Sequence, residues 1–306
     1  MQRTNLNRRQ FGIGVSAATA AWLIDGRVRA EPASFRLNYI LASPMYGTAP
    51  LAEVLAEVKP SGAQAVDIWP RPHANHREQV AELGLEKFAE LLQQHGVQVG
   101  LITRYDLGPY GLQDELRTLQ KLGGQVIVTG ARGAPGATPR EQVRAFVESL
   151  RPHVAVAEEL GLKLGIENHS RSVIDSPESI RYFAEFAKSP HLGIALAPYH
   201  LPQEADLIAK LIIDLGESLV HFQAWQHGHG CLTKLPKQEE LLQLPGRGAL
   251  DFAPLLKALQ TIRYRGYTEI FMHPTPRGIP ILETTATVTA EINRARAYLE
   301  QCLAKL

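Results

Sequence analysis

Segments typical of strands and segments typical of helices alternate along almost the whole chain. Short apolar runs that predict buried strands occur at 35–42, 63–69, 97–104, 125–129, 162–167, 192–197, 218–225 and 267–272. Helical patterns follow them at 50–58, 83–94, 112–121, 138–160, 176–188, 204–214, 251–262 and 284–304. Eight such pairs in one chain predict an α/β fold, namely a single closed (β/α)₈ TIM barrel.

Residues at the ends of these segments agree with this division. Thr138 and Ser176 each precede a proline at the start of a helical pattern, where a side-chain oxygen can cap the helix. Gly96 follows a helical pattern, where a left-handed cap is common. The alternative fold is a doubly wound open sheet, which would carry a glycine-rich phosphate loop after its first strand. Residues 42–47 do not form one, and we interpret the three-glycine segment 130–136, which follows the fourth strand and contains proline, as a loop.

The first thirty residues have the features of an export signal. Residues 7–11 read Asn-Arg-Arg-Gln-Phe, a twin-arginine signature, and an apolar stretch at 11–24 follows. This stretch is shorter than the roughly twenty residues that a membrane-spanning helix needs. Small residues near position 30 offer a cleavage site. We therefore expect a signal peptide at 1–30 and one barrel domain at 31–306, exported by the twin-arginine pathway to the periplasm or beyond, with no stable membrane span after cleavage.

The charge of the remaining chain narrows the classes of partner. Residues 31–306 carry 27 basic and 30 acidic side chains, so nothing in the balance attracts nucleic acid. Their number suits one barrel rather than two domains. Cys231 and Cys302 are the only cysteines, which argues against a disulfide framework, although a single bridge is compatible with the sequence.

Four short apolar, strand-like runs each finish with a histidine. These residues are His169, His200, His221 and His273. In a parallel barrel the carboxyl ends of all strands meet at one mouth, where active sites of this fold lie. The pattern therefore predicts that the four imidazoles gather at a single site, and imidazole is a common metal ligand.

Side chains two positions apart on a strand share a face. The groups that share a face in this way are Glu167 with His169, His221 with Gln223 and Trp225, and Glu269 with Phe271 and His273. A glutamate inside a barrel is costly unless it is paired or coordinates a metal. Glu167 is therefore the strongest candidate for a functional residue.

Several motifs occur in an order that resembles a known family. They are Gly165-Ile166-Glu167-Asn168-His169, the segment from Leu192 to His200, the strand with His221, the segment from Gly246 to Phe252, and Tyr264-Arg265-Gly266-Tyr267. Over most of residues 35–300 the chain resembles the xylose isomerase-like sugar isomerase/epimerase superfamily of metal-dependent TIM barrels. The resemblance implies a divalent metal ion and a carbohydrate substrate.

The family pattern can be compared with this chain strand by strand. The fifth strand supplies a metal-binding glutamate that exchanges a proton, and Glu167 matches it. The sixth supplies an aspartate and, three residues later, a histidine; here Ala197 replaces the aspartate, while His200 is present. His221 matches the histidine of the seventh strand. On the eighth, where the family has a second glutamate, this chain has His273, with Glu269 four residues deeper.

The resemblance therefore implies one metal ion, held by Glu167, His200, His221 and His273. A site with one carboxylate and three imidazoles favours zinc, manganese or cobalt over magnesium, which prefers oxygen ligands. We expect Glu167 to act as the general base, and His273 or Glu269 to act as the acid, in proton transfer next to a carbonyl. The substrate contacts that we expect are Trp69, Arg104, His169, Gln223, Trp225, His229 and Arg277.

This chemistry fits a metal-dependent isomerase or epimerase of a non-phosphorylated sugar or keto-sugar. Because the same intermediate can lose a leaving group, a lyase acting on a keto-glycoside is an alternative. A related metal-dependent hydrolase and a non-catalytic sugar-binding barrel are two others, and Ala197 favours the last of these. The expected partner is a small carbohydrate, and a homo-oligomer is compatible with the sequence.

Overall fold

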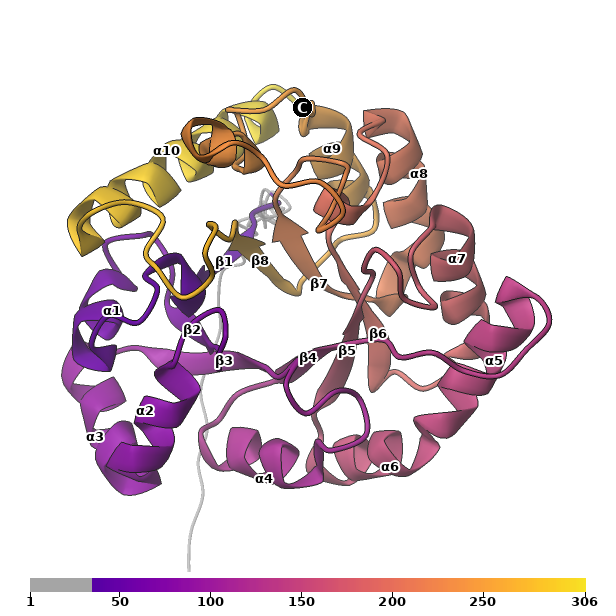
Figure 1. Ribbon diagram of the computed structural model, residues 1–306, viewed down its shortest axis with the longest axis horizontal. Helices are drawn as coiled ribbons and strands as arrows, with labels where there is room; N and C mark the ends of the chain where they lie inside the picture. Colours follow the sequence, from indigo (N-terminus) through magenta and orange to yellow (C-terminus); the bar gives the residue numbers. More distant parts are fainter. Residues whose placement is uncertain (1–34) are drawn as a thin grey trace, which may run out of the picture. The chain divides into compact units, whose positions relative to one another are not determined.

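The computed structural model describes residues 35–306, which form a closed barrel of eight parallel strands in sequential order, surrounded by helices (Figure 1). This confirms the single (β/α)₈ TIM barrel. The strands are β1 (Asn38–Ala42), β2 (Ala65–Ile68), β3 (Gln98–Thr103), β4 (Val126–Gly130), β5 (Lys163–Glu167), β6 (Leu192–Leu196), β7 (Leu219–Ala224) and β8 (Tyr267–Ile270). Each lies within a segment that the sequence predicted, except that β4 extends one residue further. The predicted export signal lies outside the described residues.

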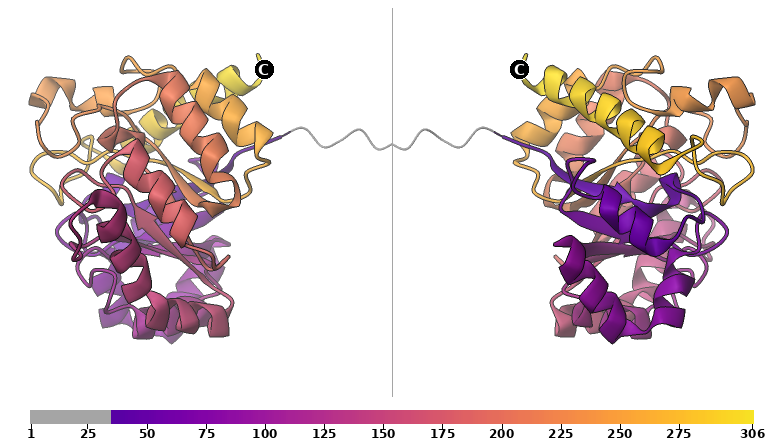
Figure 2. Two further views of the ribbon diagram at one scale, coloured as in Figure 1. Left: turned by 90° about the vertical axis from the view of Figure 1, so that its right-hand side faces the viewer. Right: turned by 90° about the vertical axis from the view of Figure 1, so that its left-hand side faces the viewer.

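The helices form a ring around these strands, and α10 packs against both α1 and α9, so the last helix meets the first (Figures 1 and 2). The α-helices are α1 (Leu51–Glu57), α2 (His76–Leu83), α3 (Leu85–His95), α4 (Gln113–Lys121), α5 (Pro139–Ser149), α6 (Arg151–Leu160), α7 (Pro177–Phe186), α8 (Ala205–Leu215), α9 (Ala253–Thr261) and α10 (Thr285–Leu303). Short 3₁₀ helices occur at η1 (Ser43–Met45), η2 (Pro198–His200), η3 (Gly216–Ser218) and η4 (Lys237–Gln243). None of the described helices is both long enough and apolar enough to cross a membrane.

The helices differ from the sequence prediction in two places. The pattern at 138–160 forms two helices, α5 and α6, because Pro152 lies in the first turn of α6 and cannot continue a preceding helix. Helix α2 was not predicted, since only His76 and Val80 of its eight residues are buried and the apolar pattern is weak. The predicted caps are confirmed, because the Thr138 and Ser176 side chains each accept a hydrogen bond from the backbone of the third helical residue.

The barrel interior has an apolar base and a polar upper part. A small buried cluster fills the base, and it includes Leu101, Val128, Val220 and Tyr267. Between β6 and β7 the register shifts, because Ile194 pairs with Leu219 whereas Ala195 pairs with His221, which leaves one extra residue in β7. The strands also carry buried polar side chains, among them Thr103, Glu167 and Gln223. The larger apolar core lies between the strands and the helices.

Candidate active site

A cavity of about 460 Å³ opens at the carboxyl ends of the strands, where this fold places its active sites. Its lining is formed by Trp69, His73, Tyr105, Gly108, Gly130, Ala131, Arg132, Glu167, His169, Ser170, Arg171, Ser172, His200, Trp225, Cys231, Phe271, His273 and Arg277. Seven of the residues that the sequence singled out are among them: Trp69, Glu167, His169, His200, Trp225, His273 and Arg277. The predicted strand ends thus do meet at one mouth.

Aromatic side chains form much of the cavity wall. The rings of Trp69 and Phe271 stack, with centroids 5.0 Å apart, and Trp225 meets the ring of Phe271 edge to face at 4.6 Å. On its other side Trp225 stacks on Tyr199 with centroids 3.8 Å apart. Trp69 and Trp225 are almost fully buried. Such aromatic faces suit ligands that have apolar surfaces.

Glu167, the last residue of β5, lies in this cavity with only 3% of its surface exposed. Its Oε1 atom lies 3.8 Å from Nε2 of His200. Burial raises the pKa of Glu167, although the neighbouring His169 acts in the opposite direction. Burial lowers the pKa of His200 to about 2, so this imidazole is neutral. A carboxyl group with a raised pKa next to a neutral imidazole is suited to accepting and returning a proton.

Backbone contacts after β5 and β6 position the two histidines beside Glu167. The Asn168 side chain accepts a hydrogen bond from the amide of Ala197 at 2.7 Å and donates one to its carbonyl at 3.1 Å, which fixes the end of β6. The chain then turns into η2, which ends at His200. His169 begins a turn closed by hydrogen bonds with Ile174 and Ser172.

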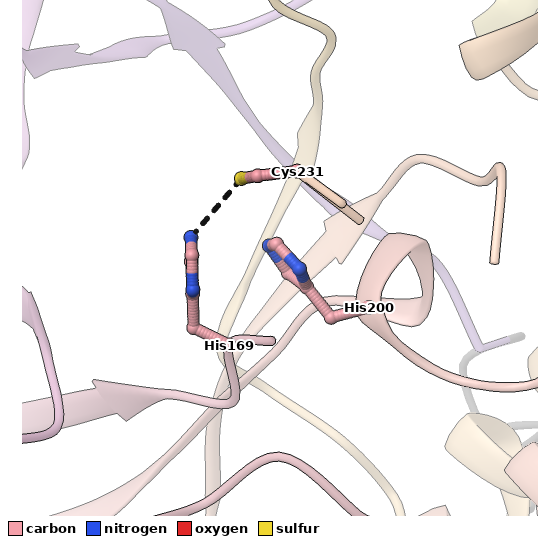
Figure 3. Close-up of side chains that lie close together, drawn as sticks. All are labelled: His169, His200 and Cys231. Carbon is pink, nitrogen blue, oxygen red and sulfur yellow. Dashed lines mark hydrogen bonds between the residues drawn. The ribbon is translucent and has the colours of Figure 1, made fainter. Parts of the chain in front are cut away.

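Cys231, a residue that the sequence prediction left out of the site, joins these histidines from the loop between β7 and α9. Within residues 35–306, the side chains of His169, His200 and Cys231 form a set whose potential ligand atoms all lie within 4.8 Å of one another (Figure 3). Nε2 of His169 lies 3.3 Å from Sγ of Cys231. The sequence signal was a cysteine in a glycine-rich stretch that also holds His227 and His229.

Three of the predicted site residues lie below the cavity rather than in it. Nε2 of His221 is 3.0 Å from Oε2 of Glu269, and the Gln223 amide lies 3.4 Å from the same oxygen. All three side chains are fully buried, and none lines the cavity. Burial raises the pKa of Glu269 and lowers the pKa of His221, and both shifts favour a neutral hydrogen-bonded pair.

This arrangement does not fit the metal ligand set that the sequence predicted. Nε2 of His221 already faces Glu269, and Ala197 offers no side-chain donor. His273 lies at the cavity wall among aromatic rings, with centroids 5.5 Å from Trp225 and 5.7 Å from His73. Of the four predicted ligands, only His200 belongs to the compact nitrogen and sulfur set. The donors that gather at the cavity are therefore His200, which the family pattern includes, and His169 and Cys231, which it does not.

Two of the predicted substrate contacts lie elsewhere. His229 is exposed and does not line the cavity. The Arg104 guanidinium is held by Asp106 at 2.8 Å and Glu115 at 2.6 Å, and Glu115 also binds Arg77. Its side chain is only 12% exposed, and it is absent from the cavity lining. Arg104 therefore connects β3 with α4 instead of facing a ligand.

We expect the substitution Arg104→Gln to lower the free energy of unfolding by about 2 kcal/mol, because it leaves the nearly buried Glu115 with one cationic partner fewer. Chemical denaturation measures this loss. Arg151→Gln is the matched control, since that side chain is 79% exposed and its contact with Glu148 is 4.0 Å long; we expect a change below about 0.5 kcal/mol. Weaker sugar binding by Arg104→Gln at unchanged stability would contradict this role.

The chain is similar to known proteins in both sequence and fold. Residues 55–298 match the model of a family described as xylose isomerase-like TIM barrel. A search of curated protein sequences finds no match. Many solved structures share the fold.

Three of these structures cover nearly the whole described chain. The IolI protein with a bound zinc atom has a TM-score of 0.66 at 16% identity and covers 88% of this chain and 99% of its own. The 3-keto-D-glucoside 4-epimerase YcjR from E. coli has a TM-score of 0.65 at 19% identity, and the match covers 87% of this chain and 100% of the epimerase. A D-psicose 3-epimerase crystallised in the presence of D-fructose has a TM-score of 0.66 at 15% identity, and the match covers 87% of this chain and 99% of the epimerase. At these identities the likeness shows a shared fold.

Proposed function

Because this chain belongs to the xylose isomerase-like TIM barrel family, we propose that it is an isomerase or epimerase acting on a non-phosphorylated sugar or keto-sugar. One observation carries the proposal: a buried carboxyl group, Glu167, lies beside the neutral His200 in a cavity with aromatic walls at the barrel mouth. Structural neighbours named as sugar epimerases support the same class of reaction.

In the proposed reaction Glu167 removes a proton from the carbon next to the carbonyl group of the substrate. Its raised pKa brings the carboxyl group closer to the range in which it can return that proton. His273 is the better candidate for the acid, because it lines the same cavity whereas Glu269 is sealed beneath it. Return of the proton to the other face gives an epimer, and its return to the neighbouring atom gives an isomer.

The residues that line the cavity indicate which sugars are candidate substrates. Trp69, Trp225 and Phe271 offer ring faces for stacking. Arg132, Arg171 and Arg277 lie at the exposed part of the lining, so sugars that carry a carboxylate belong among the candidates alongside neutral ketoses. A cavity of this volume holds a small molecule.

We include one divalent metal ion in the proposal, with zinc, manganese or cobalt favoured over magnesium. Ala197 removes an oxygen ligand from the family pattern, while nitrogen and sulfur donors gather at the cavity. Bound there, such an ion would polarise the carbonyl and hydroxyl oxygens of a sugar and acidify the neighbouring C–H bond. We also propose that the protein acts after twin-arginine export, on the strength of residues 7–11 and the apolar stretch after them.

Proton exchange tests the reaction directly. The purified protein is incubated in D₂O with ketoses, 3-keto-glycosides and sugar acids, and each mixture is followed by NMR. We expect deuterium to enter the substrate at the carbon next to the carbonyl, together with formation of an epimer or isomer. Binding of a sugar without proton exchange would contradict the proposed enzymatic activity and indicate a sugar-binding barrel. Loss of a leaving group from the substrate would indicate a lyase.

A further inference from the structure

We propose that this protein binds one zinc ion through His169, His200 and Cys231, above the strand ends and away from the position that the family pattern implies. The three donors come from separate parts of the chain: the turn after β5, the end of η2 and the β7–α9 loop (Figure 3). Their potential ligand atoms lie within 4.8 Å of one another. This distance leaves room for a small ion between them after a slight contraction.

Ser170 holds both imidazoles in place. Its carbonyl oxygen lies 2.8 Å from Nδ1 of His169, which leaves Nε2 of that ring pointing at Cys231. Its hydroxyl oxygen lies 3.0 Å from Nδ1 of His200. The Ser170 amide also donates to Nδ1 of His200 at 3.3 Å. A backbone carbonyl that accepts the second ring N–H, as at His169, orients the histidine ligands of metal sites. A single residue thus fixes the orientation of two of the three proposed ligands.

Gly230 brings the cysteine close to this pair. Its backbone has a φ angle of +50°, and a Cβ atom there would overlap Oγ of Ser170 and Nδ1 of His200. The amides of Gly228 and Gly230 both donate to the carbonyl of Tyr199 at 3.1 Å, which ties the loop to the segment that ends in His200. The loop is therefore shaped to place Cys231 beside the two histidines.

The donor set indicates zinc. A thiolate and two imidazoles suit a borderline to soft metal, whereas magnesium and calcium select oxygen ligands. Three protein ligands also leave one tetrahedral position open, as in catalytic zinc sites. The inference concerns the metal of the proposed isomerase and so rests on that function for its catalytic meaning, but zinc binding itself can be tested without a substrate.

The first experiment measures metal content and spectra of the full chain. We expect about one zinc ion per chain after dialysis against zinc, and a thiolate-to-cobalt charge-transfer band when cobalt replaces it. The substitutions Cys231→Ser and His169→Asn should each weaken zinc binding by more than about 100-fold, beyond the 10- to 100-fold typical of removing an outer partner. Cys302→Ser is the matched control, because Cys302 lies in α10, and it should keep both the zinc and the band.

A second measurement uses the unaltered protein and does not depend on how the variants fold. Zinc should slow alkylation of Cys231 while leaving that of Cys302 unchanged. Glu167→Gln should lose proton exchange but retain zinc, which separates failure of the reaction from failure of the site. Absence of zinc binding, unaltered zinc affinity in Cys231→Ser, or loss of zinc in Glu167→Gln to the same degree as in Cys231→Ser would overturn the proposal.

Discussion

Glu167→Gln is expected to lower the rate of proton exchange between substrate and solvent by about 10³-fold, within the range that a general base contributes. Glutamine keeps the size of the side chain and its place at the end of β5, but it cannot accept the proton. Glu167 is buried and lies 3.8 Å from His200. Among residues 35–306, no other carboxylate lines the cavity to replace it. The measurement is the initial rate of deuterium incorporation, followed by NMR.

The matched control for this substitution is Glu148→Gln. Glu148 is an exposed glutamate of α5 that does not line the cavity, and its substitution should leave the exchange rate unchanged. Sugar affinity provides a second readout, because Glu167→Gln should still bind the ligand. An exchange rate in Glu167→Gln equal to that of the unaltered protein would remove this residue from the mechanism.

His221→Ala should destabilise the fold by about 3 kcal/mol, because it leaves the buried Glu269 without its 3.0 Å partner and opens a cavity inside the barrel. For a domain of this size the loss corresponds to a decrease of about 5 °C in the melting temperature. Differential scanning calorimetry or thermal circular dichroism measures it. His229→Ala, which removes an exposed histidine of the β7–α9 loop, should change the melting temperature by less than about 2 °C.

The same variant separates two roles for His221. The sequence predicts a metal ligand, whereas its contacts in the structure are those of a structural residue. If it acts structurally, His221→Ala keeps its metal content at temperatures where it is folded. A loss of metal from folded His221→Ala at unchanged melting temperature would restore the ligand role.

The barrel could be predicted from the sequence because its periodicity is strong and local. Each strand is a short apolar run between turn signals. The division of 138–160 into two helices was missed because the helical pattern continues through Pro152, although the proline itself signals the start of a new helix. Helix α2 carries too few buried apolar residues for its pattern to be visible.

The site was predictable only in part, since strand alternation gives the direction of a side chain but not its depth. Alternation predicts a shared face for Trp225 and His221, yet Trp225 lines the cavity and His221 is sealed below it. Depth depends on strand tilt and on the register shift between β6 and β7, neither of which leaves a local signal. Cys231 was missed for another reason, because loop contacts such as those of Gly230 depend on tertiary structure.

The anchoring of Trp69 has a consequence for how new specificities can arise in this protein. The indole nitrogen donates to Asp67, which also accepts a hydrogen bond from Thr103, and the ring stacks on Phe271. These contacts fix the part of the cavity wall that Trp69 forms, so a ligand cannot gain room by displacing this side chain. Selection among sugars must then come from the exposed residues of the cavity lining. Laboratory evolution confined to Arg132, Arg171 and Arg277 should alter substrate preference and leave the hydrogen bonds to Asp67 intact.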